Sequence, residues 1–515
     1  MLEIEYLAEP RLQFASYFEH EDSKTGLAEF GPFGVNVSGL HPSQIRLGFI
    51  GTRETIAGAK EWVQELQSPI ESENRKTVSA AVSAGLVENP NSLFWDGILD
   101  AEPSLDEAFV RIYKILNRDF IGFSPHTPFK CGFQVNDRWD RTLQPHEIKA
   151  LLTIEDKQRR IWELVGLWDD HIKSLAQTKP SPDIIVLALT QEIEEEAHAV
   201  RVTGNFYLNF RRAIKARSMK WGIPIQLIQR NTILGKKSKG RKGPLQEKAT
   251  RAWNFCTAQY YKADGVAWRP TAFQQETCFV GIDFFVAREL RNRLTMRSSV
   301  AQAFDYLGQG LVLRGDPFEW DEEKEGRSPH MTREGARKLM RATLGEYVRV
   351  KGTTPKRVVV HKSSRFWGTN HGDYNELDGF QEGIREVFSG IEYDLVTLSR
   401  SRVRLFREGA YPPLRGTYCH IGDDAHLLYT TGFTPYLATY PGSYVPEPWQ
   451  IIEHHGGSSK KDLLREVLEL TKMNVNNCSF ADGTPITLSF SEKVGEIMKH
   501  IPEHESLQTG YKFYM

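Results

Sequence analysis

Four residues between positions 211 and 262 have side chains that suit the binding of an anion. Arg211 and Lys215 are four positions apart in a segment with helical periodicity, so both project from one face of the expected helix. Gln226 follows in a strand-like segment, and Lys262 comes from the next helical segment, just before a glycine turn. Cations and an amide that converge on one point suit a terminal phosphate, which has several acceptor oxygens and nearly two negative charges. The alternative is a basic helix face in water, which would account for any one of these residues alone.

A single aspartate stands inside the apolar segment FVGIDFF, residues 279–285. Burial of a carboxylate among valine, isoleucine and phenylalanine is unfavourable unless the carboxylate is paired or binds a metal. Asp283 is therefore a candidate metal ligand on a buried strand. Cleavage of a phosphodiester with two metal ions needs several carboxylates at one place, so partners for Asp283 are to be sought elsewhere in the chain.

The overall composition is that of an ordinary globular protein with 515 residues, enough for two or more domains. The formal net charge of −1 confines any nucleic-acid site to a local patch. Five scattered cysteines without a C-x-x-C pair favour a reducing compartment over a disulfide framework or a structural zinc. The sequence shows no signal-peptide pattern and no apolar run long enough for a membrane span, so we expect a cytoplasmic protein.

The first half of the chain alternates strand and helix signals. Strand-like segments at 44–52, 182–190 and 223–229 are separated by helical ones, which predicts a parallel, doubly wound sheet. The helix that contains Lys262 is expected to end at Gly265. Before it, GKKSKGRKG at 235–243 is either a solvated loop or a basic arm near a polyanion.

The second half has a different order of elements, beginning with the Asp283 strand. Three meandering strands are followed by helix, strand, helix and strand, which is the order of the ribonuclease-H fold. In that fold the first strand carries a metal-binding aspartate at its centre. The expected boundary between the halves lies near residue 266. After the Asp283 strand, the expected elements cover 299–308, 309–320, 332–350, 356–364, 377–389 and 393–401.

Several segments resemble the Argonaute family. RRAIKARSMKWGIPIQLI at 211–228, FCTAQYYKADGVAW at 255–268 and FVGIDFF are similar to the junction between the MID and PIWI domains, and residues 470–501 resemble the end of a PIWI domain. A chain of 515 residues has no room for the N-terminal and PAZ domains of a long Argonaute. It looks like a short prokaryotic Argonaute, with an N-terminal segment and MID domain at 1–265 and a PIWI domain at 266–515.

The resemblance implies that the MID domain holds the 5′ phosphate of a guide strand through Arg211, Lys215, Gln226 and Lys262. It also implies that the C-terminal carboxylate, here that of Met515, helps hold a magnesium ion against this phosphate. Three aromatic residues among the last five positions agree with a chain end tucked between the domains, because a frayed tail would leave them in water. An ordinary docked terminus is the alternative.

The same resemblance places the slicing acids of the PIWI domain at Asp283, Lys362 and Asn474. A lysine at the second position opposes metal binding by charge repulsion, and an asparagine at the last position brings no charge. The glutamate that completes some slicing sites falls within 319–325, where several acids are candidates. We therefore expect a PIWI domain that does not cut, with Asp283 satisfied by Lys362 or by backbone donors.

The function implied by the resemblance is that of a guide-directed recognition subunit in prokaryotic immunity. A short 5′-phosphorylated guide, expected to be RNA, would pair with complementary single-stranded DNA, so that base pairing reads the sequence. Target recognition would activate an APAZ-containing effector subunit with a TIR or sirtuin-like NADase domain or a nuclease, and oligomerisation on activation is left open. One alternative is an active guided endonuclease. Another is an unguided, ribonuclease-H-like nucleic-acid-binding scaffold, without preference for a 5′ phosphate.

Overall fold

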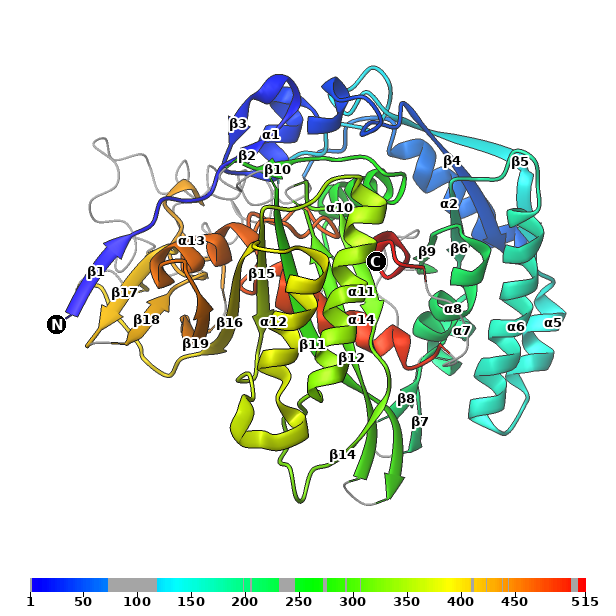
Figure 1. Cartoon of the computed structure of the whole chain (residues 1–515). Helices are drawn as coiled ribbons and strands as arrows, with labels where there is room; N and C mark the ends of the chain where they lie inside the picture. Colours follow the sequence, from blue (N-terminus) through cyan, green and yellow to red (C-terminus); the bar gives the residue numbers. More distant parts are fainter. Residues whose placement is uncertain are drawn as a thin grey trace.

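The computed structural model shows a mixed α/β protein built on two main sheets, one parallel and one larger and mixed (Figure 1). The predicted fold class, a doubly wound sheet followed by a ribonuclease-H-like one, is confirmed. The basic segment 235–243 lies outside the residues that the structure describes. The structure describes residues 2–72, 118–197, 199–203, 206–230, 246–271, 276–291, 294–305, 307–408, 412–422, 424–437, 439–442, 444–501 and 508–515.

The four-stranded sheet is parallel throughout and has the strand order β5-β4-β6-β9. Its central strand β6 reads IIVLA and is buried on both faces, because alternate side chains of a strand point to opposite sides. Helices α2 and α10 pack on one face, and α6 and α8 pack on the other. The elements are β4 (Gln44–Gly51), α2 (Arg53–Glu65), β5 (Gly132–Thr142), α5 (Pro145–Leu152), α6 (Lys157–Ala176), β6 (Ile184–Ala188), α7 (Gln191–Glu196), the hairpin β7 (Val200–Thr203) and β8 (Phe206–Leu208), α8 (Phe210–Ser218), β9 (Ile225–Ile228) and α10 (Lys248–Lys262).

Helix α10 ends three residues before the predicted Gly265, at Lys262. Asp264 adopts a left-handed conformation with φ of 64°, and the main-chain N–H of Gly265 donates to the carbonyl of Tyr260 at 2.9 Å. Aspartate is one of the residues that tolerate this conformation, so it takes the turn position that the sequence pattern assigned to glycine. Gly265 is still required, because a Cβ there would lie 2.4 Å from the Tyr260 ring.

The larger sheet has ten strands, nine of them in the order β1-β17-β18-β19-β16-β15-β11-β12-β13, while β14 pairs with β12. β11, β12 and β13 form an antiparallel meander, and β15 and β16 run parallel to β11, as the ribonuclease-H pattern predicted. The strands are β1 (Leu2–Tyr6), β11 (Thr277–Arg291), β12 (Leu294–Phe304), β13 (Gly310–Arg314), β14 (Phe318–Asp321), β15 (Arg357–Lys362), β16 (Glu392–Arg400), β17 (Thr417–Ile421), β18 (Ala425–Leu428) and β19 (Trp449–Gly456).

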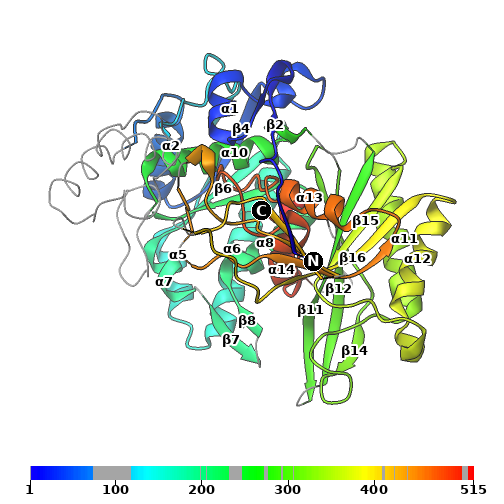
Figure 2. The same ribbon diagram turned by 90° about the vertical axis from the view of Figure 1, so that its left-hand side faces the viewer.

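Helices cover both faces of this sheet near β11. The pair α11 (Arg333–Lys351) and α12 (Glu376–Val387) packs on one face, and α14 (Ile486–Met498) packs on the other (Figure 2). A further helix, α13 (Lys460–Leu470), lies beside β18 and β19. In the part of the chain that is described, no helix has both the length and the apolar character needed to cross a membrane.

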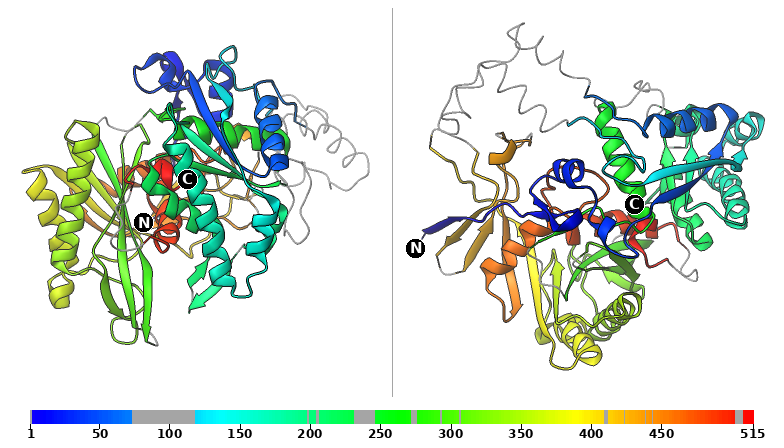
Figure 3. Two further views of the ribbon diagram at one scale, coloured as in Figure 1. Left: turned by 90° about the vertical axis from the view of Figure 1, so that its right-hand side faces the viewer. Right: turned by 90° about the horizontal axis from the view of Figure 1, so that it is seen from above.

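The N-terminal segment is shared between the two halves of the molecule. Strand β1 pairs with β17 at the edge of the large sheet, whereas β2 (Leu12–Gln13) lies between β3 (Glu19–His20) and β10 (Arg269–Pro270) in a small sheet beside α1 (Ser23–Phe30). Figure 3 shows the N-terminus at the outer edge of the large sheet and the C-terminus inside, between the two sheets. The domain boundary near residue 266 stays a prediction.

Candidate functional site

Helix α8 directs its two adjacent arginines to different surroundings. Arg212 forms an ion pair with Glu496 of α14. Arg211 instead places its positive charge near Lys215, one turn further along the helix, and near Lys262 of α10. Lys215 is only 5% exposed. The face that the sequence pattern assigned to Arg211 and Lys215 is therefore turned toward α10.

Lys262 connects the end of α10 to the start of β9. Its Nζ donates to the main-chain oxygen of Ile225 at 2.9 Å and to Oε1 of Gln226 at 2.7 Å. Gln259, one turn earlier on α10, donates its Nε2 to the same Oε1 at 3.1 Å. The structure thus brings together all four predicted anion-binding residues, and Gln259 joins them.

Gln259 is a component that the sequence reasoning missed. Its side chain is fully buried, and its Oε1 has no hydrogen-bond partner among the described residues. The signal was available, because Gln259 and Lys262 are three positions apart on one helix and therefore share a face. A buried amide among lysines suits the recognition of a polar ligand.

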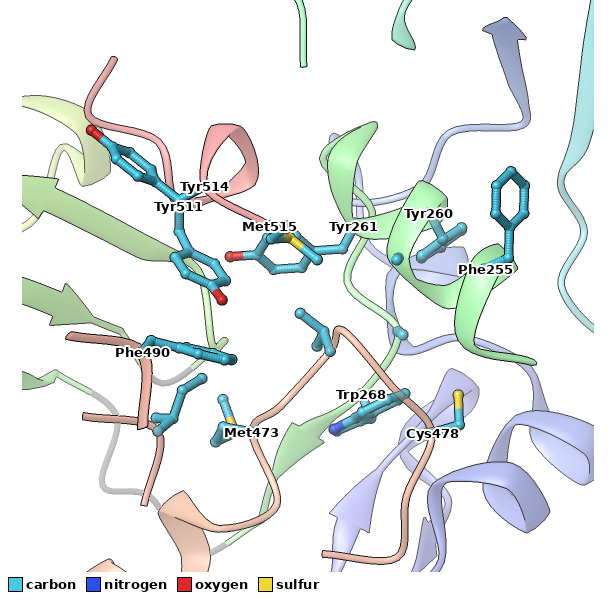
Figure 4. Packing of buried hydrophobic residues seen from close by; sticks show 14 of the residues in the cluster. Phe255, Tyr260, Tyr261, Trp268, Met473, Cys478, Phe490, Tyr511, Tyr514 and Met515 are labelled. Carbon is cyan, nitrogen blue, oxygen red and sulfur yellow. The ribbon is translucent and has the colours of Figure 1, made fainter. Parts of the chain in front are cut away.

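The C-terminal residues reach this cluster from the side of the large sheet. Lys215 Nζ donates to the main-chain oxygen of Met515. Tyr511, in the short 3-10 helix η7 (Tyr511–Phe513), stacks on Phe490 of α14 with ring centroids 4.7 Å apart and contacts Tyr261 of α10 edge-on (Figure 4). The tail is therefore docked between α10 and α14, and its last residue meets a lysine of the predicted anion site.

The cluster has an excess of positive charge. Burial lowers the pKa of Lys215 well below its usual range, and Arg211 and Lys262 lower it further. Burial and Arg211 lower the pKa of Lys262 to about 7. Within the described part of the chain, neither lysine forms an ion pair with an aspartate or glutamate side chain. Lys262, a buried lysine whose acceptors are neutral oxygens, favours a site built for an anion.

The same residues do not fit a magnesium ion on their own. Magnesium prefers carboxylate, carbonyl and phosphate oxygens. Oε1 of Gln226 and the main-chain oxygen of Met515 each already accept a hydrogen bond from a lysine, which leaves the amide oxygen of Gln259. Three neighbouring cations would also repel a divalent cation, so a magnesium ion here would depend on the negative charge of a bound phosphate.

The strand register decides which face of the large sheet Lys362 lies on. β11 and β15 are parallel, and Ile282 lies opposite Lys362. Opposite residues of paired strands point to the same face, so Lys362 shares the face of Ile282, which α11 and α12 cover. Asp283, one residue further along β11, points to the other face. Lys362 therefore does not lie on the face of Asp283, and its match to a slicing position stays a prediction.

Lys362 has a carboxylate partner of its own, which the sequence reasoning also missed. Its Nζ forms a buried ion pair with Glu376, the first residue of α12, and both side chains are at most 1% exposed. His330 Nδ1 lies 2.7 Å from Glu376 Oε1, and the main-chain N–H of Met331 donates to Oε2 at 3.0 Å. Burial would raise the pKa of Glu376, but Lys362 and His330 hold it below its usual range.

Asn474, the last predicted slicing position, lies in the loop before α14 and donates from Nδ2 to Asp482 Oδ2 at 2.6 Å. Its match to a slicing position stays a prediction. Helix α14 is the element that packs on β11 on either side of Asp283. A Cβ on Gly281 would lie 1.8 Å from the Thr487 carbonyl oxygen, and one on Gly495 would lie 3.1 Å from the Phe285 Cβ. The face of Asp283 is therefore covered by α14.

The acids at 319–325 lie on β14 and in the turn that follows it. Asp321 pairs with Lys324 at 3.1 Å, and Glu322 pairs with Arg297 of β12. Across the described residues, no three histidine, cysteine, aspartate or glutamate side chains are grouped so that they could hold a metal ion. Which of these acids matches the family glutamate stays open.

Solved structures with a similar fold are Argonaute and Piwi proteins. Clostridium butyricum Argonaute, described as bound to a guide DNA and a 19-mer target DNA, matches 98% of this chain and 54% of its own, with 13% identity and a TM-score of 0.59. A. aeolicus Argonaute matches 97% of this chain and 53% of its own, with 13% identity and a TM-score of 0.51. Drosophila Piwi matches 99% and 56%, with 11% identity and a TM-score of 0.51.

The chain spans about half the length of these solved structures. No protein-family model and no curated protein sequence matches it. Identities of 11–13% relate the folds and not the activities. The chain therefore has an Argonaute-like fold with the MID–PIWI architecture.

Proposed function

We propose that this protein is the guide-binding and target-sensing subunit of a prokaryotic defence complex in the cytoplasm, of the short Argonaute type. The observation that carries the proposal is the convergence of Arg211, Lys215 and Lys262 with the amide of Gln226. Lys215 and Lys262 are both buried, and the hydrogen-bond acceptors of Lys262 are neutral oxygens. The 5′ phosphate of a guide would supply the missing negative charge and several acceptors.

The guide in this proposal is a short RNA, and the target is complementary single-stranded DNA. The Clostridium butyricum Argonaute, which shares this fold, is described with a guide and a target DNA bound, and this supports guided nucleic-acid binding here. Magnesium would join only together with the guide phosphate, held by a phosphate oxygen and Met515. It would screen the repulsion between the phosphate and the terminal carboxylate.

We further propose that the PIWI half does not cut its target. Two-metal cleavage needs several carboxylates at one place, and the residue that the family resemblance puts at the second acid, Lys362, is a lysine paired with Glu376. The output would then come from an APAZ-containing effector subunit with a TIR, sirtuin-like or nuclease domain. The division at residue 266 into guide-binding and PIWI domains belongs to the same proposal.

The test compares one short RNA with a 5′ phosphate and with a 5′ hydroxyl at fixed salt, because backbone affinity changes steeply with ionic strength. Wild type is expected to prefer the phosphate, and Lys215→Ala/Lys262→Ala is expected to lose that preference by about 100-fold or more. The matched control, Arg212→Ala/Lys248→Ala, removes one partly exposed, paired cation from each of the same helices. Its phosphate preference is expected to stay within about threefold of wild type.

Equal binding of the two RNAs by wild type would overturn the guide proposal and favour an unguided nucleic-acid-binding scaffold. A second assay adds a complementary DNA target with Mg²⁺ or Mn²⁺. An intact target is expected, whereas a cut opposite a fixed guide position would show that the protein is an active guided endonuclease.

A further inference from the structure

The residues proposed to bind the phosphate, here called the anion cluster, are Arg211, Lys215, Gln226, Gln259 and Lys262. Without a ligand, the positive charges of this cluster repel one another. Arg211, Lys215 and Lys262 lie near one another, and Lys262 is 1% exposed. The acceptors of Lys262 are the carbonyl of Ile225 and the amide oxygen of Gln226, both neutral. A buried ammonium without a counter-ion is strongly disfavoured, and a lysine in this position releases its proton. Even a terminal carboxylate on Met515 would leave more positive than negative charges.

The groups that face Lys262 do not relieve this excess. Helix α8 contributes Arg211, Arg212 and Lys215, of which Arg212 is engaged by Glu496 of α14. In the turn after α10, Asp264 is engaged by Lys512 of the tail at 2.7 Å. The phenols of Tyr261 and Tyr511 stay neutral, since burial raises the pKa of each. Each of the two nearby acids is thus already paired with another cation.

We propose that Lys262 is uncharged in the protein without a guide and takes up one proton when a terminal phosphate binds, so that guide binding is coupled to proton uptake. The inference rests on the proposed function, since the ligand is the guide's 5′ phosphate. The neutral amine gains a proton from solvent, and the resulting ammonium pairs with the phosphate dianion. No covalent bond forms or breaks apart from this N–H bond.

The coupling makes Lys262 a residue that selects for a terminal phosphate. A terminal phosphate is a dianion above its second pKa of about 6, and two negative charges nearby favour the ammonium form of the lysine. An internal phosphodiester carries one charge and favours it less. A neutral Lys262 therefore offers little to the backbone of a long RNA and becomes a cation only for the chain end.

The experiment measures binding heats of 5′-phosphate RNA at pH 8 in buffers of different ionisation enthalpy, which gives the number of protons taken up. Uptake of about one proton is expected. The pKa of Lys262 in the protein without a ligand is about 7, so most of this amine is neutral at pH 8 before the RNA binds. The affinity should fall by up to tenfold per pH unit from pH 7.5 to 9.5. The RNA phosphate does not titrate in this window.

Two further RNAs separate charge from shape. RNA with a 5′-methylphosphate has nearly the same shape but one negative charge, and 5′-hydroxyl RNA has none. Both are expected to bind with little proton uptake and with a weaker pH dependence. Equal uptake for all three RNAs would assign the proton to another group and overturn the inference.

Variants of Lys262 test whether this residue is the group that takes up the proton. Lys262→Arg has a permanent charge, so it is expected to bind the phosphate without proton uptake and with a flat pH profile. Lys262→Met stays neutral and is expected to bind weakly at every pH, also without uptake. The control, Lys248→Met on the same helix, pairs with Glu65 at the surface and is expected to keep the wild-type uptake.

The outcomes distinguish the inference from the proposed function. A phosphate preference with no proton uptake and a flat pH profile would overturn the coupling and leave the guide pocket intact. The absence of any phosphate preference at every pH would overturn both. Wild-type uptake in Lys262→Met would also overturn the assignment to Lys262.

Discussion

Two buried lysines in this protein have opposite surroundings. Lys362, in the large sheet, is 1% exposed and forms an ion pair with Glu376, which His330 and the backbone also hold. Lys262, beside the parallel sheet, is equally buried but has only neutral oxygens as acceptors. Burial is the same in the two places, and the counter-charge is not.

The difference separates a structural charge from one that is available to a ligand. In the Lys362–Glu376 ion pair the two charges neutralise each other, so no further anion is needed. Among the described residues, no aspartate or glutamate side chain neutralises the positive charge of Lys262 and its neighbours. Burial of a lysine is therefore weak evidence of function by itself, and the nature of its partners decides which kind of site it marks.

The largest expected effect comes from breaking the satisfied pair. Glu376→Ala leaves the Lys362 ammonium buried without a partner, and we expect a loss of about 3–5 kcal/mol in the free energy of unfolding. Urea denaturation measures it. The double variant Lys362→Met/Glu376→Met removes both charges and is expected to recover most of the loss. A cost below about 1 kcal/mol for the single variant would show that the pair is solvated.

Removal of the other buried lysine, Lys262, is expected to raise the free energy of unfolding instead of lowering it. Lys262→Met removes an amine that the unfolded chain protonates more readily than the folded one, so the empty protein is expected to gain about 2–4 kcal/mol at pH 7. The folded-state pKa is lowered, so the penalty is fully present below about pH 7 and fades toward the unfolded pKa of about 10.4. The gain should therefore shrink between pH 7 and pH 9.5. A loss of stability at both pH values would contradict this account.

A smaller effect tests which face of α8 meets the phosphate. Arg211→Ala is expected to weaken binding of 5′-phosphate RNA about tenfold, or 1.4 kcal/mol, because Arg211 adds charge to the cluster. Arg212→Ala, one residue away, breaks a partly exposed pair with Glu496 and is expected to change the affinity by less than about twofold. Equal losses for the two variants would mean that the helix contributes only a general positive field.

The smallest effect tests the surroundings of Asp283 in the large sheet. Ser363→Asp adds a carboxylate to the residue that follows β15, and we expect it to give weak Mn²⁺ binding together with Asp283, seen as stabilisation of about 1.4 kcal/mol at tenfold excess over Kd. Lys362→Asp points to the other face, against Glu376, and is expected to lose stability without gaining Mn²⁺ binding. A Mn²⁺ response in Lys362→Asp alone would support the match of Lys362 to a slicing position.

The anion cluster could be predicted from the sequence because each residue had a fixed place on a helix or strand. Arg211 and Lys215 are one helical turn apart, so a correct helix sufficed to put them on one face. The face on which Lys362 lies was harder to predict, because side chains of a strand alternate with a period of two and a shift of one reverses the face. Helical periodicity tolerates such a shift better than strand pairing does.

Contacts between segments that are far apart in the chain could not be predicted from the sequence. Glu376 follows Lys362 by fourteen residues, and no spacing rule brings the start of α12 back to the end of β15. Strand β1 joins the far edge of the large sheet through β17, more than four hundred residues later. Such contacts depend on the complete topology, which only the structure supplies.

The docked C-terminus has a practical consequence for work with this protein. The main-chain oxygen of Met515 accepts a hydrogen bond from buried Lys215, and the Met515 side chain is packed beside Tyr261 and Tyr511 (Figure 4). A purification tag or fluorescent label fused after Met515 would start beside Lys215 and is expected to weaken the proposed phosphate binding. Leu2, at the opposite end, is 58% exposed, so a tag placed there is expected to leave that binding unchanged.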